Sequence, residues 1–188
     1  AVKQRTIKRD PFAGYKLESV PVNHRYLTGE QFAKLTGVEL PTYRLCHARD
    51  LFVFSTFTGL GRADLANLTS ENIVTEPDGS RWIHIERQKT KAECHIKLLD
   101  IPSRIIDKYK GEGKDGKLFF VPATSSLCRS LKMIEEQCKL GCHLTFYMAR
   151  HSFATLICLG NGVPIETISR MMGHSSIRTT QIYAEITN

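Results

Sequence analysis

Apolar residues recur at intervals of three and four along most of this chain, the spacing that gives a helix one buried face. The clearest case runs from Thr42 to Thr58 and stops at Gly59, a residue type that commonly follows the last turn of a helix. Further helices are expected around Leu65 and Leu68, from Ser125 or Ser126 to Gly141, from Thr145 to Leu159, from Pro164 to Gly173, and from Ser175 or Ser176 through Tyr183. The pattern predicts a mostly helical chain.

Alternation of apolar and polar residues, which predicts strands, is confined to the middle of the chain. The expected strands are Ile73-Val74, Trp82 to Ile85, and Cys94 to Leu98. Asp78-Gly79 is a tight-turn signal between the first two strands, and Gln88 to Ala92 would join the last two, with Lys89 and Lys91 near the tip. The expected fold class is therefore mainly α with a small antiparallel β-sheet, an α+β arrangement.

Length and apolar content favour a single domain. With 188 residues, of which 41% are hydrophobic, the chain can bury one sizeable core but not two. The segment from Ala1 to Asp10 is rich in Lys and Arg and has little apolar periodicity, which predicts a linker cut from a longer polypeptide. We therefore expect a linker and domain start over residues 1–25 and one folded domain over residues 26–188.

Composition also bears on the partner and the compartment. A net charge of +7 and a pI near 9.2 favour a polyanion such as nucleic acid. The six cysteines follow no regular framework and no cleavable leader is evident, so we expect free, mostly buried thiols in a reducing interior. No apolar run reaches the length of a membrane span, and a soluble protein with no membrane partner is expected.

Three blocks of sequence carry the strongest functional signal. They are Thr58-Gly59-Leu60-Gly61-Arg62-Ala63-Asp64-Leu65, Ala149-Arg150-His151-Ser152-Phe153-Ala154-Thr155, and the segment from Met172-Gly173-His174 through Tyr183. Their composition and order resemble the catalytic domain of the tyrosine recombinases, the phage and conjugative-transposon integrases. With Glu86 to Lys91, the resemblance covers about residues 41–188. It implies the tyrosine recombinase catalytic-domain fold over residues 26–188, without the upstream DNA-binding domain usual in that family.

The resemblance assigns the nucleophile to Tyr183. A tyrosine hydroxyl is protonated at neutral pH, with a pKa of about 10, so attack on phosphate needs positive charge nearby. Arg150 would bind the scissile phosphate, because the forked donors of arginine match two phosphate oxygens. His174 would hydrogen-bond a nonbridging oxygen and help to move the tyrosine proton. Lys89 stands where the family has the lysine that protonates the leaving 5'-oxygen, and Lys91 is the alternative.

The chain departs from the family pattern at two positions. Gly61 stands where the first catalytic arginine is expected. We expect Arg87 to replace it, with Arg62 as the alternative; if a strand continues to Lys89, residues two apart share a face, and both side chains would enter one cleft. Tyr147 stands where the family has His or Lys, one helical turn before the second arginine, and a phenol there can still donate a hydrogen bond to phosphate.

Other candidate residues have simpler interpretations. His151 follows Arg150 directly, and because a helix turns about 100° per residue, a structural or supporting position is expected. His143 is an alternative source of an imidazole, although an ordinary loop histidine is the simpler interpretation. Cys138, Cys142 and His143 lack a fourth zinc ligand and a recognisable spacing, so no metal site is expected. Phe52, Phe54 and Phe57 fall inside the first long helix and are expected in the core rather than in a base-stacking surface.

The function implied by the resemblance is site-specific recombination of double-stranded DNA through a 3'-phosphotyrosyl link. The link conserves the phosphodiester bond energy, so no cofactor is needed. The resemblance further implies a homotetramer on DNA, accessory DNA-bending proteins, and a bacterial, nucleoid-associated place in the cytoplasm. The variant first-arginine block favours integration and excision of a mobile element, by analogy. Two alternatives stay open: a DNA-binding protein that has lost catalysis, and a type IB topoisomerase.

Overall fold

A computed structural model describes the backbone of residues 26–187 and the side chains of residues 26–184; the expected linker from Ala1 to Asp10 lies outside this range. In chain order the elements are α1 (Gly29–Gly37), α2 (Tyr43–Thr58), α3 (Arg62–Asn67), the 3-10 turn η1 (Ser70–Asn72), β1 (Ile73–Thr75), β2 (Arg81–Glu86), β3 (Glu93–Lys97), α4 (Asp100–Lys108), α5 (Thr124–Cys138), α6 (Phe146–Ser152), the π-helix η2 (Phe153–Cys158), the 3-10 turn η3 (Leu159–Asn161), α7 (Ile165–Met172) and α8 (Arg178–Thr187). Helices dominate, with one small sheet, as the sequence predicts.

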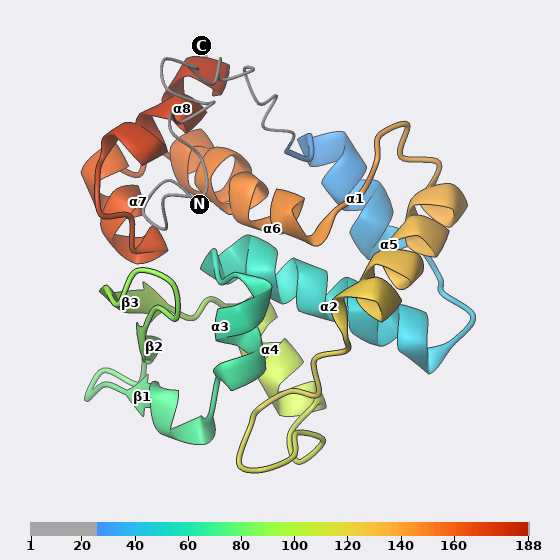
Figure 1. Cartoon of the computed structure of the whole chain (residues 1–188), viewed down its shortest axis with the longest axis horizontal. Helices are drawn as coiled ribbons and strands as arrows, with labels where there is room; N and C mark the ends of the chain where they lie inside the picture. Colours follow the sequence, from blue (N-terminus) through green and yellow to red (C-terminus); the bar gives the residue numbers. More distant parts are fainter. Residues whose placement is uncertain (1–25, 188) are drawn as a thin grey trace, which may run out of the picture.

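Helix α2 is the centre of the fold (Figure 1), packing against α4, α5 and α6. Its first turn is capped by the Thr42 hydroxyl, which accepts from the Leu45 backbone N–H. Its end is fixed by Gly59, which adopts a left-handed conformation with φ of 66°. A Cβ at this position would lie 2.6 Å from the Phe153 ring, so only glycine lets the chain leave α2 this close to η2.

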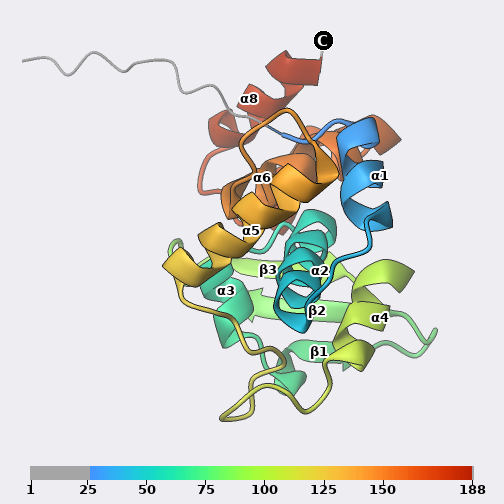
Figure 2. The ribbon, with the colours of Figure 1, turned by 90° about the vertical axis from the view of Figure 1, so that its right-hand side faces the viewer.

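The sheet is antiparallel, in the order β1-β2-β3. Its buried face carries Ile83, Cys94 and Ile96, and α7 packs against β3. Figure 2 shows α3 and α4 beside opposite ends of the sheet, with α2 between them. The turn between β2 and β3 spans residues 87–92 and extends from the sheet toward the C-terminal helices.

The C-terminal helices form a second apolar cluster of Phe153, Ala154, Cys158, Ile168, Met172 and Tyr183. The single helix expected from Thr145 to Leu159 is interrupted, because α6 widens into the π-helix η2 and then tightens into η3. Such local π geometry is often found at functional sites. The π-helix begins at Phe153, two residues after His151.

Several element boundaries differ from the sequence-based ones. Helix α5 ends at Cys138 rather than at Gly141, because Lys139 takes the left-handed conformation and closes the helix. Helix α8 begins at Arg178, after Ser175 and Ser176, and α1 and α4 were not predicted at all.

The predicted core is largely confirmed. Phe52 and Phe54 are buried, whereas Phe57 is partly exposed. None of the six cysteines forms a disulfide among the described residues, and only three of them are buried. No helix within the described residues is long and apolar enough to cross a membrane.

Candidate active site

A cavity of about 470 Å³ brings together residues that are far apart in sequence. It lies where α3, the β2–β3 turn, α6 and the α7–α8 connection meet (Figure 1). Six of the residues singled out from the sequence line it: Arg62, Arg87, Lys89, Tyr147, Arg150 and His174. Four separate segments therefore supply one strongly basic pocket.

Two arginines form the base of this cavity, and one backbone carbonyl joins them. Arg150 donates from Nη1 to the Gly59 carbonyl at 2.6 Å and from Nη2 to the Met172 carbonyl at 2.6 Å. Arg87, which is 3% exposed, donates from Nη2 to the same Gly59 carbonyl at 3.3 Å and to the Met171 carbonyl at 3.0 Å. Burial, together with the nearby Arg87 charge, lowers the pKa of Arg150 to about 10, which still leaves the guanidinium charged at neutral pH.

Asp64 attaches the β2–β3 turn to α3. One carboxylate oxygen lies 2.9 Å from Nη1 of Arg87, and the other accepts from the Gln88 backbone N–H at 2.9 Å. Thr90 makes a second attachment, because its hydroxyl donates to the Gly173 carbonyl at 2.9 Å. The turn is thus held over the cavity from two sides.

The strand-based argument for Arg87 and Lys89 is wrong in its premise. Strand β2 ends at Glu86, so neither residue lies in a strand, and the fold of the turn brings both side chains to the cavity. Of the two lysines in the turn, Lys89 lines the cavity, whereas Lys91 forms an exposed ion pair with Glu86 at 3.3 Å.

His174 is placed by the turn between α7 and α8. Its Nδ1 lies 2.7 Å from the Thr180 hydroxyl. Burial first, and then the charges of Arg150 and Arg87, lower its pKa to about 4. The ring is therefore neutral at physiological pH, with one nitrogen able to donate a hydrogen bond and the other able to accept one.

Tyr183 lies in the C-terminal apolar cluster and does not line the cavity. The side chain is 4% exposed, with its ring centroid 6.4 Å from that of His174 and 5.2 Å from that of His151. Burial raises the pKa of Tyr183 to about 12, although Arg150 opposes the shift. In this arrangement the phenol is protonated, and its side chain is not among those that line the cavity.

The remaining candidates lie around the mouth of the cavity or away from it. Tyr147 is 61% exposed, and its ring meets the buried ring of His151 edge-on at 4.4 Å. Arg62 donates from Nε to the Thr124 hydroxyl at 3.0 Å and also lines an adjoining hollow beside α5. His143 lines neither hollow and lies 3.3 Å from Glu135, from Nδ1 to a carboxylate oxygen.

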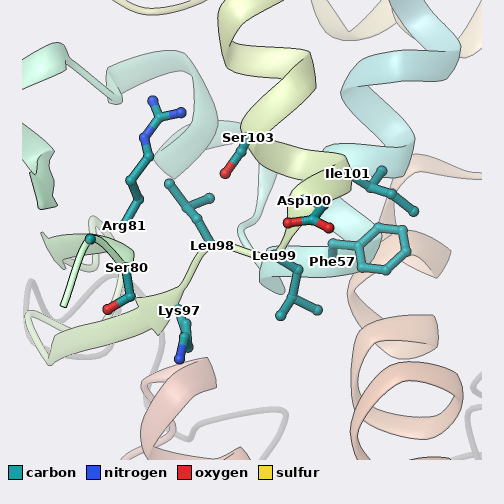
Figure 3. Close-up of a pocket in the computed structure, with 10 residues that line it drawn as sticks. Phe57, Ser80, Arg81, Lys97, Leu98, Leu99, Asp100, Ile101 and Ser103 are labelled. Carbon is teal, nitrogen blue, oxygen red and sulfur yellow. The ribbon is translucent and has the colours of Figure 1, made fainter.

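A larger hollow, of about 630 Å³, lies at the start of α4 and contains none of the motif residues. Figure 3 shows Arg81 and Lys97 beside the apolar side chains of Leu98, Leu99 and Phe57. Asp100 is also part of its wall. The hollow thus lacks the paired guanidiniums of the smaller cavity.

Sequence comparisons identify the family of the chain. The model of the phage integrase family matches residues 25–188. The chain belongs to the phage integrase family. This family member is 32% identical over 130 residues to tyrosine recombinase XerA from Saccharolobus solfataricus. The match covers 69% of the chain but only 42% of that relative, so the chain spans less than half the length of the curated protein.

Solved structures show the same fold. The XerH site-specific recombinase, in a post-cleavage complex with its palindromic difH substrate, matches with a TM-score of 0.72 and 21% identity. The match covers 95% of this chain and 53% of that one. The Tn1549 transposon integrase in complex with transposon right end DNA matches with a TM-score of 0.68 and 18% identity, over 96% of this chain and 68% of that one. The predicted fold class is therefore confirmed.

Proposed function

We propose that this chain is the DNA breaking-and-rejoining domain of a site-specific recombinase that integrates and excises a mobile element. The observation that carries the proposal is the cavity in which Arg87 and Arg150 share the Gly59 carbonyl, with Lys89 and His174 beside them. Two fixed guanidiniums suit a phosphodiester, whose charge increases in the transition state of attack. The Tn1549 integrase supports the mobile-element role, because it was solved with the end of a transposon.

In the proposed reaction these groups have the following roles. The Tyr183 hydroxyl attacks a DNA phosphorus, losing its proton, and a bond forms to the 3'-phosphate while the bond to the 5'-oxygen breaks. Arg87 and Arg150 hold the nonbridging oxygens, and Lys89 gives a proton to the leaving 5'-oxygen. Neutral His174 donates to a phosphate oxygen or accepts the tyrosine proton. A 5'-hydroxyl of a second DNA end then attacks the phosphotyrosine and restores both groups.

Arg87 takes the place of the arginine missing at Gly61. Within the described residues its Nε has no hydrogen-bond partner, so one buried donor is left over after the Asp64 and carbonyl contacts are made. A phosphate oxygen would satisfy it, since leaving a buried donor unpaired costs free energy. Arg62 is less suited to this role, because it lies at the boundary with the adjoining hollow and bonds Thr124. Tyr147, at the mouth, is assigned to a hydrogen bond with the DNA backbone.

The burial of Tyr183 means that cleavage requires a change in α8, which carries it. We propose that Tyr183 leaves its buried position when the chain binds double-stranded DNA. In that complex the protein would be a homotetramer, assisted by DNA-bending proteins. Bacterial, nucleoid-associated cytoplasm remains the proposed location.

Covalent trapping on a nicked DNA substrate tests the proposal, using the full-length protein and its validated recombination site. We expect a denaturation-resistant adduct from the wild type that is lost in Tyr183→Phe and in Arg87→Ala. Arg62→Ala is the matched control and should retain the adduct. If the wild type binds the site but never forms the adduct, the chain is a DNA-binding protein without catalysis.

A plasmid relaxation assay distinguishes the proposed recombinase from a type IB topoisomerase. A recombinase exchanges strands between two copies of its site, whereas a type IB topoisomerase relaxes supercoils without a specific site. Relaxation of a plasmid that lacks the site, with no recombination of one that has two, would replace the proposal by the topoisomerase.

A further inference from the structure

The outward face of the β2–β3 hairpin carries two metal-binding side chains next to each other, outside the candidate active site. His84 in β2 is directly opposite His95 in β3. Their ring centroids are 4.3 Å apart, with an interplanar angle of 68°. His95 is exposed and His84 half-buried, so both rings are open to solvent on the face opposite Cys94 and Ile96.

Neither imidazole ring forms a polar contact with the rest of the described structure. Within the described part of the chain, no hydrogen bond or ion pair involves either ring, and their mutual contact is the one interaction they make. A hollow of about 290 Å³ lies against them, with Asn72 and Ile85 completing its wall. Polar rings without partners beside an open hollow are available to a ligand.

The next residue pair on the same face of the hairpin adds negative charge beside the two histidines. Glu86 is directly opposite Glu93, and both line the hollow. Like charges directly opposite each other destabilise a sheet unless a cation lies nearby. Lys91 pairs with Glu86 at 3.3 Å, but no ion pair involves Glu93 among the described residues. Two imidazoles and two carboxylates thus line the hollow, and only one of the carboxylates is paired with a lysine.

We propose that His84 and His95 bind a divalent transition-metal ion of the Zn²⁺ class. The described residues contain no group of three His, Cys, Asp or Glu side chains already placed to hold a metal ion, so the site requires a carboxylate to move toward the histidine pair. Glu86 or Glu93 supplies a third ligand by turning its exposed side chain, and water fills the remaining positions. Imidazole nitrogen with carboxylate oxygen suits Zn²⁺, Co²⁺ or Ni²⁺, whereas Mg²⁺ and Ca²⁺ require oxygen ligands.

Such an ion would join β2 to β3 immediately before the turn that holds Lys89. Cross-linking the strands at this point restricts opening of the turn, so backbone amides of residues 87–92 should exchange more slowly with the ion bound. Capture of Glu86 by the metal would also release Lys91 from its ion pair. Binding itself is independent of the proposed recombinase function.

Calorimetric titration of the whole chain with Zn²⁺, under reducing conditions, tests the proposal. We expect one ion per chain, with affinity falling by at least about tenfold in His84→Gln and in His95→Gln, since loss of even an indirect metal contact commonly costs that much. His143→Gln is the matched control, because it removes another exposed imidazole, close to Cys142, and should not change the affinity. Both hairpin positions lie outside the core, so metal-free melting temperatures should match the wild type.

The absorption spectrum of bound Co²⁺ distinguishes the proposed ligands from thiolates. This matters because the six cysteines, none of them in a disulfide, could also bind the metal. Nitrogen and oxygen ligation gives only weak d–d bands, whereas thiolate ligation adds an intense charge-transfer band. The proposal is overturned by a thiolate band, by absence of saturable binding, or by affinities that are the same in the wild type and both hairpin variants.

Discussion

Replacing Asp64 with Asn tests whether the buried ion pair holds the β2–β3 turn in place. The Asp64 side chain is 12% exposed and the Arg87 side chain 3%, so the substitution leaves a buried guanidinium without its counter-ion. Breaking such a pair from one side costs about 3 to 5 kcal/mol. Asn keeps an acceptor for the Gln88 N–H, and two carbonyls still hold Arg87, which places the expected loss near the lower limit, about 3 kcal/mol.

Urea unfolding of Asp64→Asn beside Asp107→Asn measures this difference. Asp107 forms a more exposed pair with Arg81 at 3.4 Å, and its loss should cost less than about 1 kcal/mol. Adding Arg87→Met to Asp64→Asn removes the unpaired charge and should recover part of the stability, because an apolar side chain of similar length is cheaper to bury. The reasoning fails if the two single variants lose equal stability, or if Arg87→Met destabilises the Asp64 variant further.

Three further predictions concern the surroundings of the cavity. Gly173→Ala should cost about 2 to 4 kcal/mol in urea unfolding, because φ is 63° and the new Cβ would lie 2.7 Å from both Arg87 Cγ and Cys94 Sγ; a loss below about 1 kcal/mol would contradict this packing. The wild type should lose stability relative to His174→Gln as pH falls from about 6.5 to 4, because burial lowers the pKa of His174 to about 4 and the unfolded chain therefore binds the proton first. Allowing for solvent screening, this difference is about 1 to 2 kcal/mol, and pH-independent parallel curves would refute it. DNA affinity should fall as salt rises, since a chain of net charge +7 gains from counterion release; a flat plot of log Kd against log salt would exclude phosphate contacts as its basis.

Elements with a strong local pattern were predictable from the sequence. Helix α2 has apolar residues on a continuous helical spacing and a glycine at its end, and the β1–β2 turn contains Asp78-Gly79, so each is determined by neighbouring residues. Helices α1 and α4, of nine residues each, were not predicted, although α7, with eight residues between Pro164 and Gly173, was.

The sequence predicted several of the residues that line the cavity, but not the contacts among them. The motifs identified Arg150, His174 and Lys89, and all three line the cavity. The contacts of Asp64 and Thr90 were missed, because they connect residues more than twenty positions apart and nothing local indicates the partner. Asp64 lies in the block that begins at Thr58, but its position gave no sign that it would form an ion pair with Arg87.

The sequence motif also could not predict the burial and the raised pKa of Tyr183, the proposed nucleophile. Tyr183 does not line the cavity, whereas Arg87 and Arg150 do, and against the single carboxylate of Asp64 they leave a net positive charge of one unit before Lys89 is counted. In the proposed function this charge would bind a DNA phosphate while the phenol stays buried with a pKa raised to about 12. Arg150 already opposes this rise in pKa. Movement of Tyr183 toward the arginines would lower the pKa of the phenol from this raised value, because positive charge would be nearer and burial would be smaller. In the proposed mechanism, activation of the tyrosine and its approach to the phosphate would then be one step, which would limit attack to complexes in which Tyr183 has moved toward the phosphate.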